Sequence, residues 1–247
     1  MDNAIPRNPD YEDEMTINTI YHGDSLQVLK TLLDESIDCC VTSPPYWGLR
    51  NYNVDGQLGL EKTPEEYVAK MVEVFKEVKR VLKKEGTLWL NLGDTYSTQR
   101  WSNKPSTTGI SGKQYDVLIE KETCLPDKNL VGIPWRVSFA LQSDGWYLRQ
   151  DIIWHKPNPM PESVTDRCTK AHEYIFLLAK SQKYYFDNKA ISEKTNDLNT
   201  KQRSFRKKGG KSTLRNDTGA IYKPRETRNK RSVWTINTKP YKGAHFA

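Results

Sequence analysis

The sequence has little that would support a metal centre, a disulfide framework or a membrane span. Its four cysteines include no C-x-x-C pair, and its four histidines are isolated from one another. Cys39 and Cys40 lie within an apolar run, which favours free buried thiols over metal ligands. No apolar stretch approaches the roughly 20 residues of a membrane helix, and the N-terminus has no apolar signal core. These absences predict a soluble, intracellular protein with no metal site.

Positive charge is concentrated in one segment. The chain has 38 Lys and Arg against 31 Asp and Glu, a formal net charge of +7. Residues 196–231 hold 12 basic and 3 acidic residues, so the rest of the chain is slightly acidic. Such a segment favours a polyanionic partner, and the 7 Trp and 13 Tyr suit base stacking, although most aromatics serve the core. The alternative is a flexible basic tail without specificity.

The first part of the chain has the strand–helix–strand order of an α/β sheet. Residues 19–22 are predicted to form a short strand and residues 26–33 a helix with leucines at helical spacing. Residues 37–41 are continuously apolar, which predicts a strand buried on both faces.

The next helix has a capping box, with Thr63 as N-cap, Pro64 at the first helical position and Glu66 reaching back. We expect Gly86 to end it and residues 87–92 to form the following strand. The apolar stripe of this helix comprises Tyr67, Met71, Val74, Val78 and Val81.

Later elements are marked less strongly. The polar residues 97–115 predict a mobile loop, and residues 134–143 predict a helix. Residues 147–155 and 174–179 read as strands that suit an antiparallel pair, and residues 184–186 suit an extension of the sheet.

Ser43-Pro44-Pro45-Tyr46 is the most informative stretch. It follows the apolar run 37–41 and is extended by Trp47 and Gly48. Each proline fixes φ and lacks an N–H, so backbone carbonyls are expected to face outward as free acceptors. A rigid turn with a hydroxyl on one side and aromatics on the other suits a flat polar group. The alternative is an ordinary strand-to-loop turn.

These residues resemble the catalytic loop of the β group of DNA amino-methyltransferases, and the Ser-Pro-Pro-Tyr form resembles the N4-cytosine type. Further segments appear in that family's order: Gly23-Asp24, the two helices, and Leu90-Asn91-Leu92-Gly93-Asp94. Residues 154–159 (WHKPNP) and 172–176 (HEYIF) also resemble later strands of the family.

The resemblance implies a Rossmann-like α/β sheet that binds S-adenosylmethionine at the carboxyl ends of its strands. Asp24 matches the family's acidic residue near the cofactor, and Thr42 is also expected to bind the cofactor. The alternative role of Asp24 is a helix cap. Asp94 is expected to be structural. The implied location is the cytoplasm of a bacterial, archaeal or phage-infected host cell.

The implied reaction is methyl transfer to the N4 amine of a cytosine in double-stranded DNA. Such an amine is a poor nucleophile because its lone pair is delocalised into the ring. The Ser43 hydroxyl and the Pro44 carbonyl would accept hydrogen bonds from the two N–H groups of this amine and so redirect its lone pair. Pro45 completes the turn. Tyr46 would stack on the base, which must be flipped out of the duplex. Core packing is the alternative for Tyr46 and Trp47.

In that family the segment in the place of residues 196–232 reads the DNA sequence. We therefore divide the chain into a polar tail (1–18), a catalytic domain (19–195), a basic DNA-recognition segment (196–232) and a return toward the catalytic domain (233–247). Phosphate binding by this segment would be salt-dependent. The predicted DNA-binding residues are Trp47, Arg203, Arg206, Lys207, Lys208, Lys211, Arg215, Arg225 and Arg228.

One family signature is absent: Asp-Pro-Phe-x-Gly-x-Gly, which would follow Val233-Trp234. We therefore expect a sheet incomplete at its C-terminal end, exposed sheet edges and weak S-adenosylmethionine binding by this chain alone. A separate polypeptide carrying the signature is one explanation; a fragment or a divergent enzyme are others. Alternative functions are N6-adenine methylation, a catalytically silent DNA-binding remnant, and methylation of RNA or protein.

Overall fold

The computed structural model describes residues 18–52, 54–97, 124–195 and 226–239. The chain divides into two compact units, Met1–Tyr185 with Val233–Ala247, and Phe186–Ser232. The predicted loop 97–115 lies outside the described residues except for its first position, as does most of the basic segment. The two units are described separately below.

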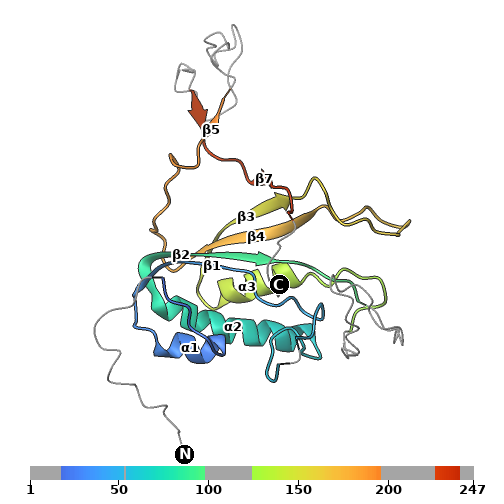
Figure 1. Ribbon diagram of the computed structural model, residues 1–247, viewed down its shortest axis with the longest axis horizontal. Coiled ribbons are helices and arrows are strands. Elements are labelled where there is room, and N and C mark those ends of the chain that lie inside the picture. Colours follow the sequence, from blue (N-terminus) through green and yellow to red (C-terminus); the bar gives the residue numbers. More distant parts are fainter. Residues whose placement is uncertain (1–17, 53, 98–123, 196–225, 240–247) are drawn as a thin grey trace, which may run out of the picture. The chain divides into compact units, whose positions relative to one another are not determined.

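The first unit contains a five-stranded sheet with the strand order β1-β2-β4-β3-β7 (Figure 1). β1 (Ile37–Thr42) runs parallel to β2 (Leu82–Leu92), and β4 (His172–Ala179) runs antiparallel to both β2 and β3 (Tyr147–His155). β7 (Val233–Thr235) is parallel to β3. The predicted antiparallel pair is confirmed, and the whole is the mixed α/β sheet expected of a Rossmann-like methyltransferase.

Three helices, α1 (Ser25–Thr31), α2 (Pro64–Val81) and α3 (Ile133–Ser143), lie on one side of this sheet in Figure 1. The capping box of α2 is present: Thr63 Oγ1 accepts from the Glu66 N–H at 3.1 Å, and Glu66 Oε2 accepts from the Thr63 N–H at 3.3 Å. The cap sets the register in which the helix buries its apolar stripe. Phe75, and not the predicted Val74, belongs to that buried stripe.

α2 ends at Val81, so the expectation that Gly86 terminates it is wrong. Gly86 lies within β2, where pairing with β1 jumps from Ile37↔Leu82 to Cys39↔Thr87. A Cβ at position 86 would lie 2.9 Å from the Lys83 carbonyl oxygen and 3.2 Å from that of Asp38. Glycine is therefore required by a close backbone approach inside the sheet.

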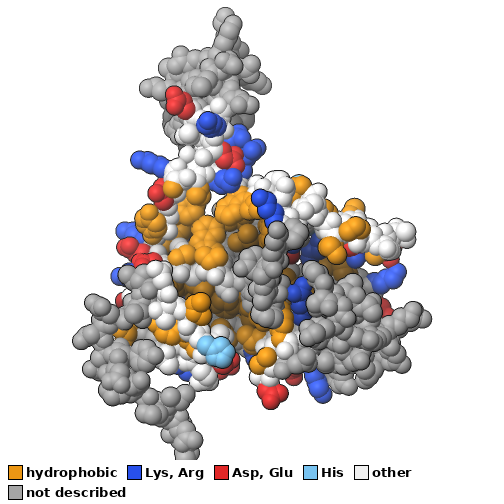
Figure 2. Space-filling view, viewed as in Figure 1, with side chains coloured by type: hydrophobic (Ala, Val, Ile, Leu, Met, Phe, Trp, Pro, Cys, Tyr) orange, Lys and Arg blue, Asp and Glu red, His pale blue; other side chains and the backbone are white. Residues whose placement is uncertain are grey.

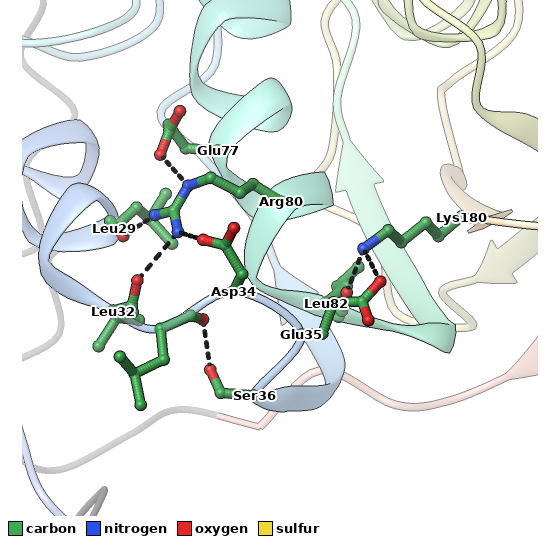
Figure 3. Close-up of polar contacts among 10 residues, drawn as sticks. Leu29, Leu32, Asp34, Glu35, Ser36, Glu77, Arg80, Leu82 and Lys180 are labelled. Atoms are coloured by element: carbon green, nitrogen blue, oxygen red, sulfur yellow. Dashed lines mark hydrogen bonds and ion pairs between the residues drawn. The ribbon is translucent and has the colours of Figure 1, made fainter. Parts of the chain in front are cut away.

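Arg80, near the end of α2, holds the end of α1 (Figure 3). Its Nη2 donates to the Leu29 carbonyl at 2.7 Å and its Nη1 to the Leu32 carbonyl at 3.0 Å. The same guanidinium pairs with Asp34 and Glu77. Because the last carbonyls of a helix have no partner within it, a remote arginine at this point satisfies them and ties α1 to α2.

The sheet is less covered than the sequence predicted. β1 is not buried on both faces, since Val41 is 78% exposed and Cys39 is also exposed. Among the described residues β1 pairs only with β2. Figure 2 shows hydrophobic side chains gathered over the strands on the visible face. Apolar exposure of this kind follows because the described helices cover one face alone.

Two short predicted strands are not present. Residues 19–22 form no strand, and Ile20 is 94% exposed because it has no sheet neighbour. Residues 184–186 also lie outside the sheet, although the Tyr185 N–H donates to the Glu85 carbonyl at 3.1 Å. Within the described ranges, no helix is long and apolar enough for a membrane span, and no cluster of His, Cys, Asp and Glu has the arrangement of a metal site.

The second unit contains a two-stranded antiparallel ribbon, β5 (Glu193–Lys194) with β6 (Thr227–Arg228). One carboxylate organises its basic side chains: Glu193 pairs with Arg228 at 3.3 Å, Lys230 at 3.4 Å and Arg231 at 2.9 Å. Three cations around one anion leave this ribbon with an excess of positive charge.

Candidate functional site

The predicted catalytic residues follow β1 directly, at the carboxyl end of that strand. Thr42 is the last residue of β1 and pairs with Leu90 of β2. Ser43 is exposed, whereas Pro44, Pro45 and Tyr46 are half-buried. The loop therefore presents one hydroxyl to solvent on a partly buried support.

The Tyr46 hydroxyl connects the catalytic loop to the sheet. Ser43 Oγ donates to Tyr46 Oη at 3.3 Å, and Tyr46 Oη lies 2.9 Å from both Asn91 Oδ1 on β2 and Glu173 Oε2 on β4. Glu173 in turn pairs with Lys156, the residue after β3. Side chains from the β1 loop, β2, β4 and the residue that follows β3 thus meet at one point of the sheet.

The protonation states of this cluster are set by burial and by one lysine. Burial raises the pKa of Tyr46 well above its usual range, and the neighbouring Glu173 carboxylate raises it further. Burial alone would raise the pKa of Glu173, but the Lys156 ammonium and the bonds from Tyr46 and Asn91 outweigh it, so this pKa lies below its ordinary value. At neutral pH the tyrosine is a neutral hydroxyl beside a carboxylate anion.

One of the two proline carbonyls is occupied by a hydrogen bond. The Tyr67 hydroxyl, from α2, donates to the Pro45 carbonyl at 3.0 Å. The expectation of free proline carbonyls is therefore wrong for Pro45, and for Pro44 it stays a prediction.

Trp47 is not a candidate for DNA contact. Its side chain is 1% exposed, and its indole N–H donates to the Glu61 carbonyl at 2.8 Å. Glu61 also accepts from the Gly59 N–H at 2.8 Å. A buried indole of this kind cannot stack on a base, so the structure corrects the prediction in favour of core packing.

The two acidic residues that follow strands or turns both cap helices. Asp24 Oδ1 accepts from the Gln27 N–H at 3.0 Å, as the N-cap of α1. Asp94 Oδ1 accepts from the Gly132 and Ile133 N–H groups at 2.9 and 3.0 Å, where α3 begins. The structural role expected for Asp94 is present. Asp24 keeps a second carboxylate oxygen that the cap does not use.

Most predicted DNA-binding residues belong to a part of the basic segment that the structure does not describe. These are Arg203, Arg206, Lys207, Lys208, Lys211, Arg215 and Arg225, which lie outside the described residues. Arg228 is described, and it lies in β6 paired with Glu193. A role for these residues stays a prediction.

Sequence reasoning missed Asn91, Lys156 and Glu173 as members of the site. Each belongs to a segment that resembles the family, but the sequence alone predicted no functional role for any of the three. The available signal was polarity inside apolar strands: Asn91 interrupts TLWLNL, and Glu173 precedes YIFLLA. A polar side chain in a buried strand needs a hydrogen-bond partner. Here Asn91 and Glu173 both contact the Tyr46 hydroxyl, and Glu173 also pairs with Lys156.

The α/β sheet and the Ser-Pro-Pro-Tyr loop at its carboxyl edge are features of the Rossmann-like methyltransferase class. A family model described as DNA methylase matches residues 37–246, and the chain belongs to that family. It is 44% identical over 234 residues to the type II methyltransferase M.Cfr9I of Citrobacter freundii, covering 95% of this chain and 69% of the relative. It is also 44% identical to M.SmaI of Serratia marcescens over 227 residues, 91% of this chain and 68% of the relative.

A solved structure supports the fold assignment. The PvuII DNA methyltransferase, described as cytosine-N4-specific, matches with a TM-score of 0.51 and 18% identity. The match covers 90% of this chain and 58% of that chain. The chain thus spans about two thirds of the curated relatives and a smaller share of the PvuII enzyme.

Proposed function

We propose that the protein transfers a methyl group from S-adenosylmethionine to the N4 amine of a cytosine in double-stranded DNA. One observation carries the proposal: Ser43 presents an exposed hydroxyl beside the Pro44 carbonyl, on a loop held by Tyr46 at the carboxyl edge of the sheet. Ligands of open α/β sheets bind at this edge. The relatives named type II methyltransferases support modification of DNA within a restriction-modification system.

Ser43 and Pro44 would orient the amine. A cytosine amine has two N–H bonds, and the two oxygens provide two acceptors for them. Once both N–H bonds are held, the nitrogen is drawn toward tetrahedral geometry and its lone pair is directed out of the ring. Orientation and electrostatics of this kind supply rate without a covalent intermediate.

Tyr46 would provide the surface on which the flipped base rests. Extrusion of a base from the duplex costs a few kcal/mol, which stacking on an aromatic ring helps to offset. The Tyr46 ring is held in place because its hydroxyl is tied to Asn91 and Glu173 and because the ring packs against Gly93. A fixed ring receives a base with little loss of side-chain entropy.

Asp24 and Thr42 fit the role of cofactor-binding residues. The carboxylate of Asp24 is exposed and has an oxygen beyond the one used in the helix cap, which suits a hydroxyl or amine of an adenosyl group. Thr42 ends β1 beside the catalytic loop. When bound, S-adenosylmethionine supplies the electrophilic methyl group.

Double-stranded DNA is proposed as the partner because of the positive charge of the segment 196–231. Arg228 and the basic residues of the segment 196–231 would neutralise backbone phosphates, which makes binding dependent on salt. The Glu193 carboxylate holds Arg228, Lys230 and Arg231 close together at one end of that segment. Clustered cations suit the closely spaced phosphates of a duplex.

N6-adenine methylation is the alternative on the same loop, because the adenine amine offers the same pair of N–H bonds. Serine at position 43 favours cytosine. The assay that separates the two is transfer of labelled methyl groups to duplex DNA, followed by digestion and nucleoside analysis. N4-methylcytosine is expected, and Ser43→Ala is expected to lower transfer at least about tenfold.

Other results of this assay have distinct meanings. N6-methyladenine would overturn the choice of base and leave the methylase assignment standing. Salt-sensitive DNA binding that Ser43→Ala leaves unchanged, with no methyl transfer at any cofactor concentration, would identify a silent DNA-binding protein instead.

A further inference from the structure

The Glu173–Lys156 ion pair lies directly behind the proposed catalytic loop. Glu173 is the second residue of β4, opposite Trp154 of β3, and Lys156 follows two residues after Trp154. Lys156 Nζ contacts Glu173 Oε1, and the other carboxylate oxygen faces Tyr46 Oη at 2.9 Å. The two side chains are only 20% and 19% exposed, so water screens the pair weakly.

This pair determines where the hydroxyl protons of the site point. The Tyr46 hydroxyl has one proton and two acceptors at equal distance, Asn91 Oδ1 and Glu173 Oε2. A carboxylate is the stronger acceptor because the bond is charge-assisted. When the Tyr46 hydroxyl donates its hydrogen bond to Glu173, the lone pairs of Tyr46 Oη remain available. They accept the hydrogen bond from the Ser43 hydroxyl at 3.3 Å. Ser43 Oγ is then left with lone pairs and no free proton.

We infer that Glu173 and Lys156 are positioning residues that fix the Ser43 oxygen as a hydrogen-bond acceptor for the substrate amine. The inference rests on the proposed function. The substrate presents N–H groups, so a Ser43 proton directed at it would repel it. The carboxylate acts through Tyr46, and the lysine keeps the carboxylate charged and in place.

A purely structural role for the pair is the competing explanation. Ion pairs away from water seldom add net stability over an apolar pair of the same volume, because desolvation offsets the attraction. Stability alone therefore gives little reason for charges at this point. The two explanations also differ in a measurable way: a structural role acts on the whole sheet, whereas a positioning role acts only through the Tyr46 hydroxyl.

A double-mutant cycle on Glu173 and Tyr46 separates them. Glu173→Gln keeps the shape and removes the charge, so we expect kcat for methyl transfer to fall about tenfold or more with the DNA KM within about twofold. Tyr46→Phe breaks the chain of hydroxyls. In that background Glu173→Gln is expected to change kcat by less than about twofold, since the two residues act as one unit.

Matched variants control for charge and for place in the fold. Lys156→Arg keeps the cation and is expected to retain most activity, whereas Lys156→Met is expected to lower kcat as Glu173→Gln does. Glu162 is also partly exposed, at 27%, and pairs with Arg167 between β3 and β4. Glu162→Gln is expected to leave kcat within about twofold of the wild type.

A spectroscopic readout tests the hydroxyl chain without activity. With tyrosine isotopically labelled at Cζ, the Tyr46 resonance is identified by its loss in Tyr46→Phe. It is expected to shift in Glu173→Gln and to stay in place in Glu162→Gln. A Tyr46 resonance unmoved by Glu173→Gln, or equal losses of kcat from Glu173→Gln in both Tyr46 backgrounds, would overturn the inference. Absence of methyl transfer by the wild-type chain would instead count against the proposed function, and the resonance would still report on the hydroxyl chain.

Discussion

The Tyr46 ring lies against the α-carbon of Gly93. A Cβ built at position 93 would lie 2.5 Å from Tyr46 Cε2 and 2.7 Å from Cδ2. Gly93 follows the end of β2, two residues after Asn91, whose amide oxygen faces the tyrosine hydroxyl at 2.9 Å. The strand end thus packs against both the ring and the hydroxyl of Tyr46, which holds the catalytic loop in position.

Gly93→Ala is therefore expected to displace Tyr46 and lower methyl transfer about 100-fold, the cost of misplacing a catalytic group by about 1 Å. The cost in stability is smaller, about 1–3 kcal/mol for an overpacked site. Steady-state kinetics and urea unfolding measure the two effects. Gly56→Ala is the control, since a Cβ there meets nothing within 4 Å, although its φ of +75° adds some backbone strain. Equal kinetics for Gly93→Ala and the wild type would contradict this role of glycine.

Asp94→Ala is expected to destabilise the protein by about 1–2 kcal/mol, the cost of losing a helix cap. The N-cap residue of α3 is Gly132, which has no side chain, so Asp94 provides the acceptor from a distant part of the chain. Asp94→Asn keeps an oxygen acceptor and should restore most of the loss. Chemical denaturation measures both, and an Asn variant as unstable as the Ala variant would show that charge and not capping matters.

Arg80→Met is expected to cost about 1–3 kcal/mol, because it removes charge-assisted bonds from the end of α1. Lys83→Met offers a comparison, since Lys83 pairs with Asp38 at 2.7 Å but the two are 48% and 81% exposed. An exposed pair contributes about 0–1 kcal/mol. The prediction fails if urea unfolding gives the two variants the same loss.

Local sequence signals predicted the elements whose structure depends on neighbouring residues. The Thr63–Glu66 box begins α2, and the period of apolar residues gives β3 at residues 147–155 as predicted. The cap depends on interactions within a few residues, which the sequence displays directly, whereas the apolar residues of β3 indicate a strand that is completed by pairing with β4 and β7.

Features that depend on distant partners were not predicted. Val41 has the apolar character of a buried strand but is exposed, because burial depends on what covers the sheet. Gly86 has the character of a helix terminator but sits where β1 and β2 come close. Trp47 beside the catalytic loop packs inward, since its indole finds the Glu61 carbonyl. At Gly86 and Trp47 tertiary contacts override the local pattern, and at Val41 the lack of a covering element does.

The catalytic loop was predicted and its supporting shell was not. The Ser-Pro-Pro-Tyr run is continuous in sequence, whereas Asn91, Lys156 and Glu173 come together only through the register of β2, β3 and β4. A single sequence without contacts does not relate residues that are more than 100 positions apart, as Tyr46 and Glu173 are.

The pH dependence of methyl transfer is expected to reveal the charge on Glu173. Lys156 and Tyr46 face this carboxylate directly, Asn91 adds a bond, and Lys170 interacts with it electrostatically. Because its pKa lies below the ordinary value, kcat should stay constant as the pH falls and decline only below the range in which a free glutamate titrates, about pH 4.3. A decline that begins above this range in the wild type would contradict the assignment.

Lys156→Met should move that decline to higher pH. Without the ammonium, burial becomes the leading influence and raises the pKa of Glu173.

The same shift in the pKa of Glu173 determines how the free energy of unfolding depends on pH. In the wild type a lowered pKa stabilises the folded state above the unfolded pKa, and this contribution is lost as the pH falls through the folded value. In Lys156→Met the raised pKa makes the carboxylate oppose folding at neutral pH, so the deficit in unfolding free energy should shrink on acidification. Urea unfolding of both proteins from about pH 7 to about pH 4 measures this convergence, and curves that stay parallel would exclude Glu173 as the group responsible.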